Sequence, residues 1–488
     1  MKRFLFCIFI TIFFIACKDK EVTLPPEPAT QVSLQYVNKW IYGIMSDLYY
    51  WNTTLPAAKT TDVNPADYFK TLKNKEDRFS AIFASYKDIM NQLNGVSSAD
   101  IGFEFELYRE SNSNDNILGQ IIYTKRGTVA DKLGIKRGNI FRKINGQQLT
   151  MTNYSKLLNL FYDTSSSAAV TFSIFQNGEF VDNTSATTIT KAVNYQEDPV
   201  FIDTVYTVQN KKIGYLVYNF FTNDAGDNSK KYDLELNTII GSFKAQNVSE
   251  LIIDLRYNHG GMMTSAINFS SMLVPNLTTD KVFSYTQYNK ILTDYFNSAD
   301  FKKQSTENPF VSNFVTTINP TFPSTTSVPI QNMGSNLQRI FFLTGKGTAS
   351  ASEMVINGLK PFFPCVLIGD TTVGKNVGST LVHDTENLKN NWAFMPIFLK
   401  YFNKDHLSDF TNGFAPDFFV EDDFKNQLGD TNEALLAKAI GQISGVKVSS
   451  SKAPSFQRTN VKSSVDFKLI HDALIVENKA LDRFNHRK

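Results

Sequence analysis

The amino-acid sequence predicts a multidomain α/β protein. With 488 residues, 42% of them hydrophobic, the chain is long enough to bury more than one core. Within residues 340–380, the apolar runs Ile340–Leu343 and Val366–Ile368 flank a segment with apolar residues at helical spacing. Strand, turn, helix and strand in that order predict a crossover unit of an α/β sheet, with active-site loops at the strand ends. A separate apolar stripe at helical spacing, Trp40–Leu48, predicts a helical segment ahead of the sheet.

The two turns of this crossover unit carry the candidate chemistry. Ser350 lies where the first turn passes into the helix, and its small neighbours Ala349 and Ala351 leave the hydroxyl accessible. The free N–H groups at the start of a helix can hold an oxyanion. Lys375, in the second turn, can act as general base if an apolar pocket lowers its pKa. Each residue alone has a plainer explanation, because serines often cap helices and lysines are usually solvated loop residues.

Three motifs in a fixed order favour the catalytic interpretation. Thr348–Glu353 reads T-A-S-A-S-E and resembles the signature of the carboxy-terminal processing, or tail-specific, serine proteases. A lysine follows Ser350 25 residues later in a Gly-Lys pair, as in that family. Leu251–Gly261 resembles the family's D-L-R-x-N-x-G-G strand and loop. The resemblance implies Ser350 as nucleophile, Lys375 as base, and an α/β catalytic core of the crotonase-like or ClpP-like type over residues 193–445.

The same resemblance implies a set of supporting residues. The oxyanion hole would use the N–H group of Ala351 and that of a glycine, and the sequence leaves the choice between Gly260 and Gly261 open. Glu353 is expected to hydrogen-bond near the lysine or to cap the helix. Many relatives have a glutamine four residues after the lysine. Here that position is Ser379, whose hydroxyl could orient the base instead.

Other elements of the catalytic domain follow from the apolar pattern. Helices are predicted at Tyr232–Phe243 and Thr431–Ile443. Asp254 and Arg256 close a buried strand and are expected to form a structural ion pair, because a buried strand end must satisfy its polar groups.

A helical segment and a strand-rich module precede this domain. Residues 32–95 predict a small helical domain, with one of its helices over Ile82–Leu93 and no catalytic grouping. In residues 96–192, the triplet Ile101-Gly102-Phe103 resembles the carboxylate-binding loop of a PDZ domain, just ahead of its peptide-binding strand.

The PDZ resemblance extends to a G-x-x-A-x-x-x-G-I-x-x-G run beginning at Gly127 and to Ile144-Asn145-Gly146. Such a domain adds a peptide as an extra strand and caps its terminal carboxylate with loop N–H groups. A degenerate module that only positions the catalytic domain is the alternative.

The N-terminus predicts export and lipidation. Residues 1–17 combine two basic residues with an apolar run too short to span a bilayer, and the ending F-I-A-C resembles a bacterial lipobox. Cleavage would leave Cys17 as the lipid-modified first residue of a tether over residues 18–31. An ordinary signal peptide with an incidental cysteine is the alternative. The expected location is the bacterial cell envelope, with a lipid anchor in the outer membrane facing the periplasm or the surface.

The remaining features limit the choice of partners. The net charge is +2, with no basic patch that would bind nucleic acid. No His, Cys and carboxylate cluster at ligand spacing accompanies the motifs, so neither a metal nor another cofactor is expected. Residues 446–488 form a Ser- and Lys-rich tail that is expected to be loosely ordered, with a possible short helix over Phe467–Leu481.

The sequence therefore predicts a lipid-anchored serine endopeptidase that acts on exported proteins or peptides near their C-termini. A Ser-His-Asp hydrolase is disfavoured because no G-x-S-x-G elbow occurs and the choice of base would rest on His259. A penicillin-recognising enzyme would need K-T-G, which is absent. The remaining alternative is a catalytically inactive family member that binds peptides or other ligands.

Overall fold

The computed structural model describes residues 32–110, 113–163, 165–321, 323–445, 459–464 and 474–475. The expected signal peptide (1–17), the lipid-attachment residue Cys17 and the tether (18–31) lie outside the described residues. Within the described part of the chain, no helix combines the length and the hydrophobicity needed to cross a membrane.

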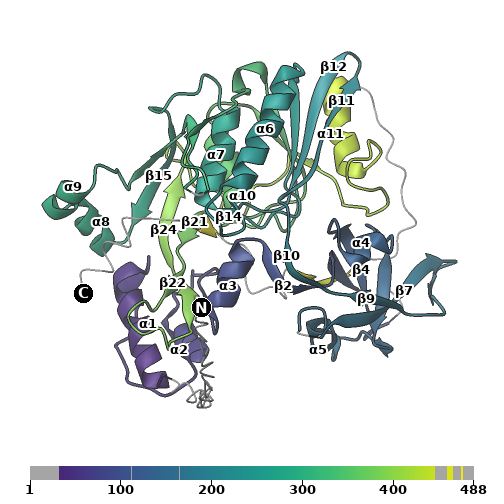
Figure 1. Ribbon diagram of the computed structural model, residues 1–488, viewed down its shortest axis with the longest axis horizontal. Coiled ribbons are helices and arrows are strands. Elements are labelled where there is room, and N and C mark those ends of the chain that lie inside the picture. The colour runs from purple at the N-terminus through teal and green to yellow at the C-terminus, as the bar shows by residue number, and fades with distance from the viewer. Residues whose placement is uncertain are drawn as a thin grey trace, which may run out of the picture.

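A six-stranded sheet forms the centre of the largest domain (Figure 1). In spatial order its strands are β11 (Val200–Val208), β12 (Lys211–Tyr218), β13 (Glu250–Asp254), β19 (Ile340–Thr344), β20 (Cys365–Gly369) and β25 (Phe418–Phe419). Neighbouring strands are parallel, apart from the antiparallel pair β11 and β12. The carboxyl ends of β13, β19 and β20 therefore meet at one edge of the sheet, where a parallel sheet carries its functional loops.

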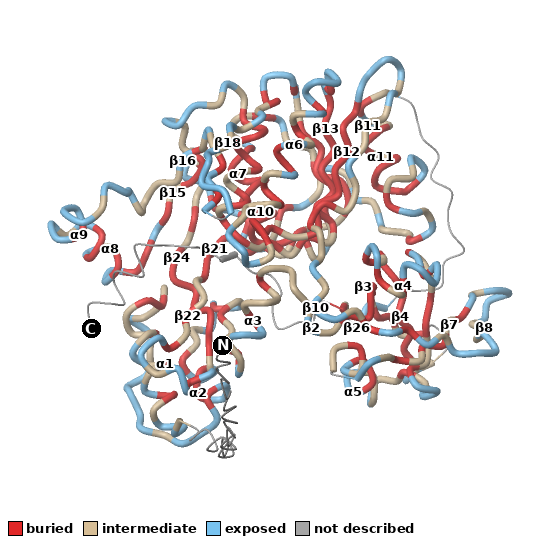
Figure 2. Tube along the Cα trace, in the orientation of Figure 1, coloured by how far each residue is buried: buried red, intermediate tan, exposed pale blue. Residues whose placement is uncertain are grey.

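Helices cover both faces of this sheet, as strands that are apolar on both sides require. One face packs against α6 (Lys231–Ala245), α7 (Met263–Leu273) and α10 (Ala351–Leu359), and the other packs against α11 (Ala434–Ser444). Successive residues of β13 alternate between these cores, since Leu251 and Ile253 join the first and Ile252 joins the second. The buried strands between the helix layers are visible in Figure 2. The predicted α/β architecture is confirmed.

A second six-stranded sheet contains the strands that come directly after two loops of the central sheet, the loop after β13 and the loop after β20. Its strands, in spatial order, are β14 (Gly261–Met262), β27 (Leu474–Ile475), β21 (Val377–Ser379), β24 (Ile397–Phe402), β15 (Val282–Tyr288) and β16 (Val311–Asn313). The connection between β15 and β16 carries α8 (Lys290–Asn297) and α9 (Ala299–Gln304). A short ladder of β17 (Thr317–Ile318) and β18 (Val328–Pro329) precedes β19.

The N-terminal segment contains α1 (Leu34–Leu48), α2 (Pro65–Leu72) and α3 (Tyr86–Leu93) (Figure 1). The predicted helix over Ile82–Leu93 is wrong at its start, because β1 (Ala81–Phe83) pairs antiparallel with β23 (Ala393–Met395), which also pairs with β22 (Val382–His383). Ser85 begins α3 instead, with its side chain accepting a hydrogen bond from the N–H group of Asp88. The helical segment is thus joined by a strand to the domain that contains the central sheet.

A separate β-rich domain lies beside the domain that contains the central sheet (Figure 1). Its sheet has the spatial order β26 (Thr459–Ser463), β3 (Phe103–Arg109), β4 (Ile117–Thr124), β5 (Ile140–Ile144), β7 (Ser167–Gln176) and β8 (Glu179–Asp182), with β6 (Gln147–Gln148) on β5 and β9 (Thr187–Thr190) on β7. Two short helices, α4 (Val129–Lys132) and α5 (Tyr154–Asn159), belong to this domain. The antiparallel strands β2 (Val96–Asp100) and β10 (Ala192–Gln196) connect it to its neighbours.

The C-terminal tail departs from the sequence-based expectation. Loose ordering from residue 446 is wrong for Thr459–Ser463, which form strand β26. The possible helix over Phe467–Leu481 is contradicted at Leu474–Ile475, which form strand β27, and its other residues lie outside the described part. A Ser- and Lys-rich segment can join a sheet without an apolar signal, because the main chain supplies the hydrogen bonds.

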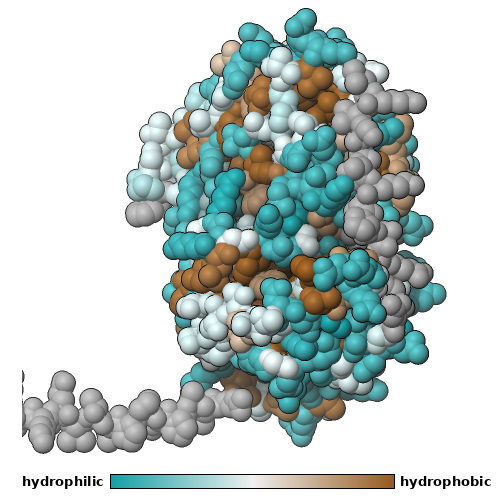
Figure 3. Space-filling model, turned by 90° about the vertical axis from the view of Figure 1, so that its right-hand side faces the viewer, coloured by the Kyte–Doolittle hydropathy of each residue, from teal (hydrophilic) through white to brown (hydrophobic). Residues whose placement is uncertain are grey.

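Hydrophobic side chains are exposed in separate patches on the face shown in Figure 3. Ile174 and Val181, which lie opposite each other on β7 and β8, are 54% and 43% exposed. Exposed apolar residues of this kind are common on protein surfaces.

Candidate active site

Ser350 is the first residue of the candidate site and the N-cap of α10. Its backbone is in a conformation that non-glycine residues rarely adopt, with φ 62° and ψ −110°. The side chain is buried, and its Oγ has no hydrogen-bond partner among the described residues. A strained backbone and an unpaired buried hydroxyl are both unfavourable in isolation. Together they are features that cluster at active sites.

The loop after β13 holds the Ser350 turn in place. The Asn258 carbonyl accepts hydrogen bonds from the N–H group of Ala349 and the hydroxyl of Ser352, both at 3.1 Å. The Thr348 hydroxyl donates to the carbonyl of Leu255 at 2.7 Å. The carboxyl ends of β13 and β19 are therefore fixed to each other by three hydrogen bonds immediately around the serine.

Glu353 connects the serine turn to the lysine turn. Its Oε2 accepts hydrogen bonds from the N–H groups of Ser350 and Lys375, both at 2.8 Å. Its Oε1 accepts from the Thr372 hydroxyl at 2.6 Å and from the N–H group of Gly374 at 2.7 Å. Burial raises the pKa of the Glu353 carboxyl, and these four hydrogen bonds oppose that rise. Both expected roles of Glu353, near the lysine and at the helix start, are present.

Tyr401, on β24, connects the same two residues from another side. Its hydroxyl lies 2.9 Å from the Lys375 carbonyl and 3.3 Å from the Ser350 carbonyl. Burial and the nearby carboxylate of Glu353 raise the pKa of this hydroxyl, which keeps it a neutral donor. Sequence analysis missed Tyr401, because a tyrosine in an apolar strand carries no signal of this contact.

Lys375 is buried next to an aromatic ring from the N-terminal segment. Its Nζ lies 5.2 Å from the centre of the Phe79 ring, within the range of a cation–π contact. The neighbouring Arg78 donates to the carbonyls of Val373 and Thr411, at 3.1 and 3.0 Å. The N-terminal segment, in which no catalytic grouping was expected, thus covers the lysine turn.

The two candidate oxyanion glycines differ in how their N–H groups are used. The N–H group of Gly260 donates to Asn258 Oδ1 at 2.9 Å. Gly261 has φ 136°, and a Cβ there would lie 2.0 Å from the Phe221 carbonyl oxygen, so only glycine fits. Gly260 is engaged within its own loop, whereas the Gly261 backbone pairs with the separate strand β27, so we favour Gly261 as the donor once that strand is displaced. Ala351 is the first residue of α10, where intrahelical hydrogen bonds do not use the N–H groups.

The remaining predicted residues lie farther along the chain. Ser379 is buried in β21, the strand that begins two residues after Lys375, and its backbone pairs with Ile397. Ile101, Gly102 and Phe103 lie in the β-rich domain, at the start of β3.

A buried ion-pair network supports the loop after β13. The predicted pair is confirmed, with Arg256 and Asp254 at 2.8 Å. Arg256 also contacts Glu433, the N-cap of α11, at 2.6 Å. Glu433 and its neighbours Asp422 and Asp423 lie close enough together to hold a cation, but Arg256 and Arg137 already face this group.

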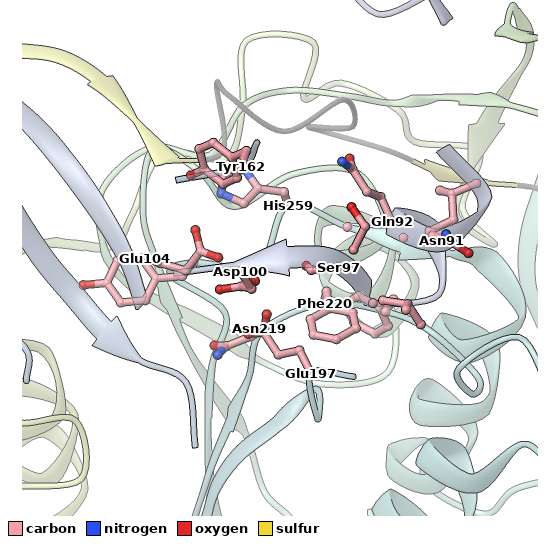
Figure 4. A pocket seen from close by; sticks show the side chains of 18 of the residues that line it. Asn91, Gln92, Ser97, Asp100, Glu104, Tyr162, Glu197, Asn219, Phe220 and His259 are labelled. Atoms are coloured by element: carbon pink, nitrogen blue, oxygen red, sulfur yellow. The ribbon is translucent and has the colours of Figure 1, made fainter. Parts of the chain in front are cut away.

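A pocket lies between the β-rich domain and the loop after β13 (Figure 4). The β-rich domain contributes Glu104 and Tyr162, the connecting strand β2 contributes Asp100, and the loop contributes His259, Gly260 and Gly261. Asn219 also lines this pocket, and its buried Nδ2 has no partner among the described residues. The pocket therefore connects the β-rich domain to the glycines of the candidate site.

Comparison with known proteins identifies the family of this chain. Residues 212–420 match the model for peptidase family S41, and residues 36–81 match the model for the peptidase S41 N-terminal domain. The chain belongs to peptidase family S41. The first match begins in β12 and ends just after β25, so it contains every strand of the central sheet except β11.

Two curated relatives are distant in sequence. A Staphylococcus aureus (strain COL) protein named "Probable CtpA-like serine protease" is 20% identical over 327 residues, which is 67% of this chain and 54% of the relative. A protein of the same name from Staphylococcus saprophyticus is 18% identical over 340 residues, or 70% of this chain and 57% of the relative. The chain thus spans a little over half the length of these two relatives.

A solved structure supports the fold. The crystal structure of a Bacteroides fragilis protein described as an S41 protease has a TM-score of 0.65 and 23% identity, and the match covers 83% of this chain and 97% of that one. At this identity the likeness concerns the S41 fold alone.

Replacing Glu353 with glutamine is expected to lower the unfolding free energy of the protein. A glutamine side chain has one acceptor oxygen and one NH2 group, so it cannot accept from all four donors. Hydrogen bonds to a charged group contribute about 1.5 to 3 kcal/mol each, and we expect a loss of roughly 3 kcal/mol in unfolding free energy. Denaturant unfolding measures this loss. Glu76→Gln, at an exposed position, is the matched control, and equal stability of the two variants would contradict the connecting role.

Proposed function

We propose that the chain is a serine endopeptidase with Ser350 as nucleophile and Lys375 as general base. The observation that carries the proposal is the Ser350 hydroxyl, which is buried, unpaired among the described residues, and held at the N-terminus of α10. Glu353 and Tyr401 each bind the backbones of both proposed catalytic residues. Such positioning is what a nucleophile and its base require.

The proposed reaction proceeds through an acyl-enzyme. Ser350 Oγ attacks the carbonyl carbon of the scissile bond, while the neutral amine of Lys375 takes the hydroxyl proton. Lys375 returns that proton to the nitrogen of the leaving peptide as the C–N bond breaks. Water then attacks the ester carbonyl carbon as Lys375 accepts a proton from it. The bond between that carbon and Ser350 Oγ breaks, Lys375 returns the proton to Oγ, and the peptide leaves with a new carboxyl terminus. The N–H groups of Ala351 and Gly261 would stabilise the oxyanion formed in both steps.

Substrate binding is proposed to involve the β-rich domain, as a PDZ-like module. Its strand β3 follows the Ile101-Gly102-Phe103 loop, and a pocket connects this domain to the candidate active site. The substrates would be exported proteins or peptides, cut near their C-termini as the family resemblance implies. An extended peptide would add to β3 through main-chain hydrogen bonds.

The alternative is an inactive family member that binds peptides or other ligands. Labelling the full chain with a serine-directed fluorophosphonate or a boronate separates the two, as does casein hydrolysis. An enzyme labels at Ser350 and cuts casein. An inactive member does neither, although its peptide binding is unaffected.

Location at the cell envelope is also proposed, on the evidence of the lipobox-like residues 14–17. Cys17→Ser is expected to release the protein from the membrane fraction or to leave its signal peptide uncleaved, because the lipid is added to the cysteine thiol. Fractionation of cells and mass measurement of the N-terminus test this. Membrane attachment and processing identical to wild type would contradict lipidation.

A further inference from the structure

The peptide-binding strand of the β-rich domain is already occupied by the chain itself. Strand β26 (Thr459–Ser463) runs antiparallel to β3, on the edge opposite β4. Thr459 pairs with Arg109 and Ser463 pairs with Glu106, so β26 runs toward the start of β3. Without β26, this side of β3 would be an open sheet edge that can accept an extended peptide.

Side-chain contacts at the end of β26 resemble recognition of a ligand. Ser464 is buried, and its hydroxyl accepts a hydrogen bond from the N–H group of Phe105 at 3.1 Å. The same hydroxyl donates to the Glu104 carboxylate at 2.5 Å, and the Tyr162 hydroxyl donates to the Ser464 carbonyl at 3.4 Å. Val461 packs against the core of the domain. The β-rich domain therefore binds the main chain of β26, the hydroxyl of Ser464 and the apolar side chain of Val461.

The charged side chains around Ser464 favour a ligand with a hydroxyl at this position over one with a terminal carboxylate. Lys125 Nζ contacts the carboxylates of Asp100, Glu104 and Glu197 at 2.5, 2.8 and 3.2 Å. One cation thus faces three carboxylates, and a fourth carboxylate would be repelled. The N–H group of Gly102, in the predicted carboxylate-binding loop, already donates to Asp100 Oδ1 at 2.8 Å. The edge of β3 therefore fits a peptide segment that continues beyond this position and carries a hydroxyl opposite Glu104.

The same tail also reaches the candidate active site. In β27, the backbone of Leu474 pairs with Gly261, and that of Ile475 pairs with Met262 and Ser379. Strand β27 therefore lies between the favoured oxyanion glycine and the strand that follows Lys375. The pocket in Figure 4 adjoins both regions, since Glu104 and Tyr162 line it together with Gly261.

We propose that the C-terminal tail, through β26 and β27, is an intramolecular ligand that blocks the substrate-binding surface. A substrate must displace it, and an internal peptide segment with serine or threonine opposite Glu104 is the ligand that fits. The part concerning hydrolysis rests on the proposed function, whereas the occupation of β3 does not. A tethered ligand competes at an effective concentration on the order of millimolar, so displacing it weakens the apparent affinity for a free peptide.

Two full-length variants test the proposal in a Ser350→Ala background, where no substrate is consumed. Ser464→Asp places a carboxylate against Glu104, and Val461→Asp places one in the apolar core. Ser185→Asp, at an exposed position of the same domain, is the matched control. The probe is a fluorescent peptide with the sequence of residues 457–466 and an amidated end. Each tail variant is expected to bind it at least about tenfold more tightly than the control and the parent.

Hydrogen exchange provides an independent measurement. The N–H group of Phe105, which donates to Ser464, should exchange at least about tenfold faster in both tail variants when no peptide is present. Equal peptide affinity in the two tail variants, the Ser185→Asp control and the Ser350→Ala parent would overturn the proposal. Lower melting temperatures of the tail variants without tighter peptide binding would overturn it as well. Those results would make β26 a permanent strand of the domain.

With Ser350 restored, both tail variants should hydrolyse casein at least about tenfold faster than wild type. If tighter peptide binding occurs but none of the proteins cuts casein, the proposed peptidase activity fails while the intramolecular ligand stands. If casein is cut at equal rates by all of them and affinity is unchanged, the intramolecular ligand fails while the peptidase activity stands.

Discussion

Replacing Ser350 with alanine is expected to reduce kcat/KM for peptide hydrolysis by at least about 10³-fold, because the attacking oxygen is removed. The fold should persist. The Ser350 hydroxyl makes no hydrogen bond within the described residues, so its removal costs none. Its N–H group donates to Glu353 and its carbonyl accepts from Tyr401, and alanine retains both contacts. We expect the unfolding free energy to change by less than about 1 kcal/mol.

Ser270→Ala is a matched control for this variant. Ser270 is also buried with a hydroxyl that has no partner among the described residues, but it lies near the C-terminal end of helix α7 and not in a loop at the strand ends. The control should therefore retain full activity. Turnover by purified Ser350→Ala comparable to that of the control would eliminate Ser350 as nucleophile. Loss of activity in both variants would instead indicate a general effect of removing buried hydroxyl groups.

The local parts of the site could be predicted from the sequence. Strand β19, the Ser350 turn and helix α10 follow one another without a break, so apolar spacing and the T-A-S-A-S-E run are enough to predict them. The Asp254–Arg256 ion pair is equally local, because both residues lie at the end of one strand.

Contacts between distant segments could not be predicted in this way. Tyr401 lies 51 positions after Ser350, and only the pairing of β24 with β21 brings it to the site. Phe79 reaches Lys375 because the N-terminal segment folds back onto the lysine turn. Neither residue belongs to a motif or to a polar cluster in the sequence. Their positions depend on the tertiary fold.

The contacts of the C-terminal tail were even less predictable from the sequence. Ser464 lies 359 positions after Phe105, to which it is hydrogen-bonded, and its surroundings are rich in serine and lysine. A strand that is added to an existing sheet edge needs few apolar residues of its own. Composition therefore predicted loose ordering where the structure has β26. The two oxyanion glycines were likewise indistinguishable until the contact between Gly260 and Asn258 was known.

The proposed base is tested most directly by replacing Lys375 with arginine. A guanidinium stays protonated at any pH that the fold tolerates, so it cannot accept the proton of the Ser350 hydroxyl. We expect kcat/KM to fall by at least about 10³-fold in Lys375→Arg, and equally in Lys375→Met, which keeps the length without an amine. Lys346→Arg, at an exposed position with its side chain 75% exposed, should have wild-type activity.

The pH dependence gives this prediction a second, independent measurement. Because only the neutral amine can act as base, wild-type kcat/KM should rise with pH and become constant once Lys375 has lost its proton. The trace of activity left in Lys375→Met should lack that rise, since the titrating group is gone. Measuring both profiles on the same peptide, with unfolding followed at each pH, separates the loss of the base from a loss of structure. Substantial hydrolysis by Lys375→Arg, or an unchanged profile in Lys375→Met, would show that another group takes the proton.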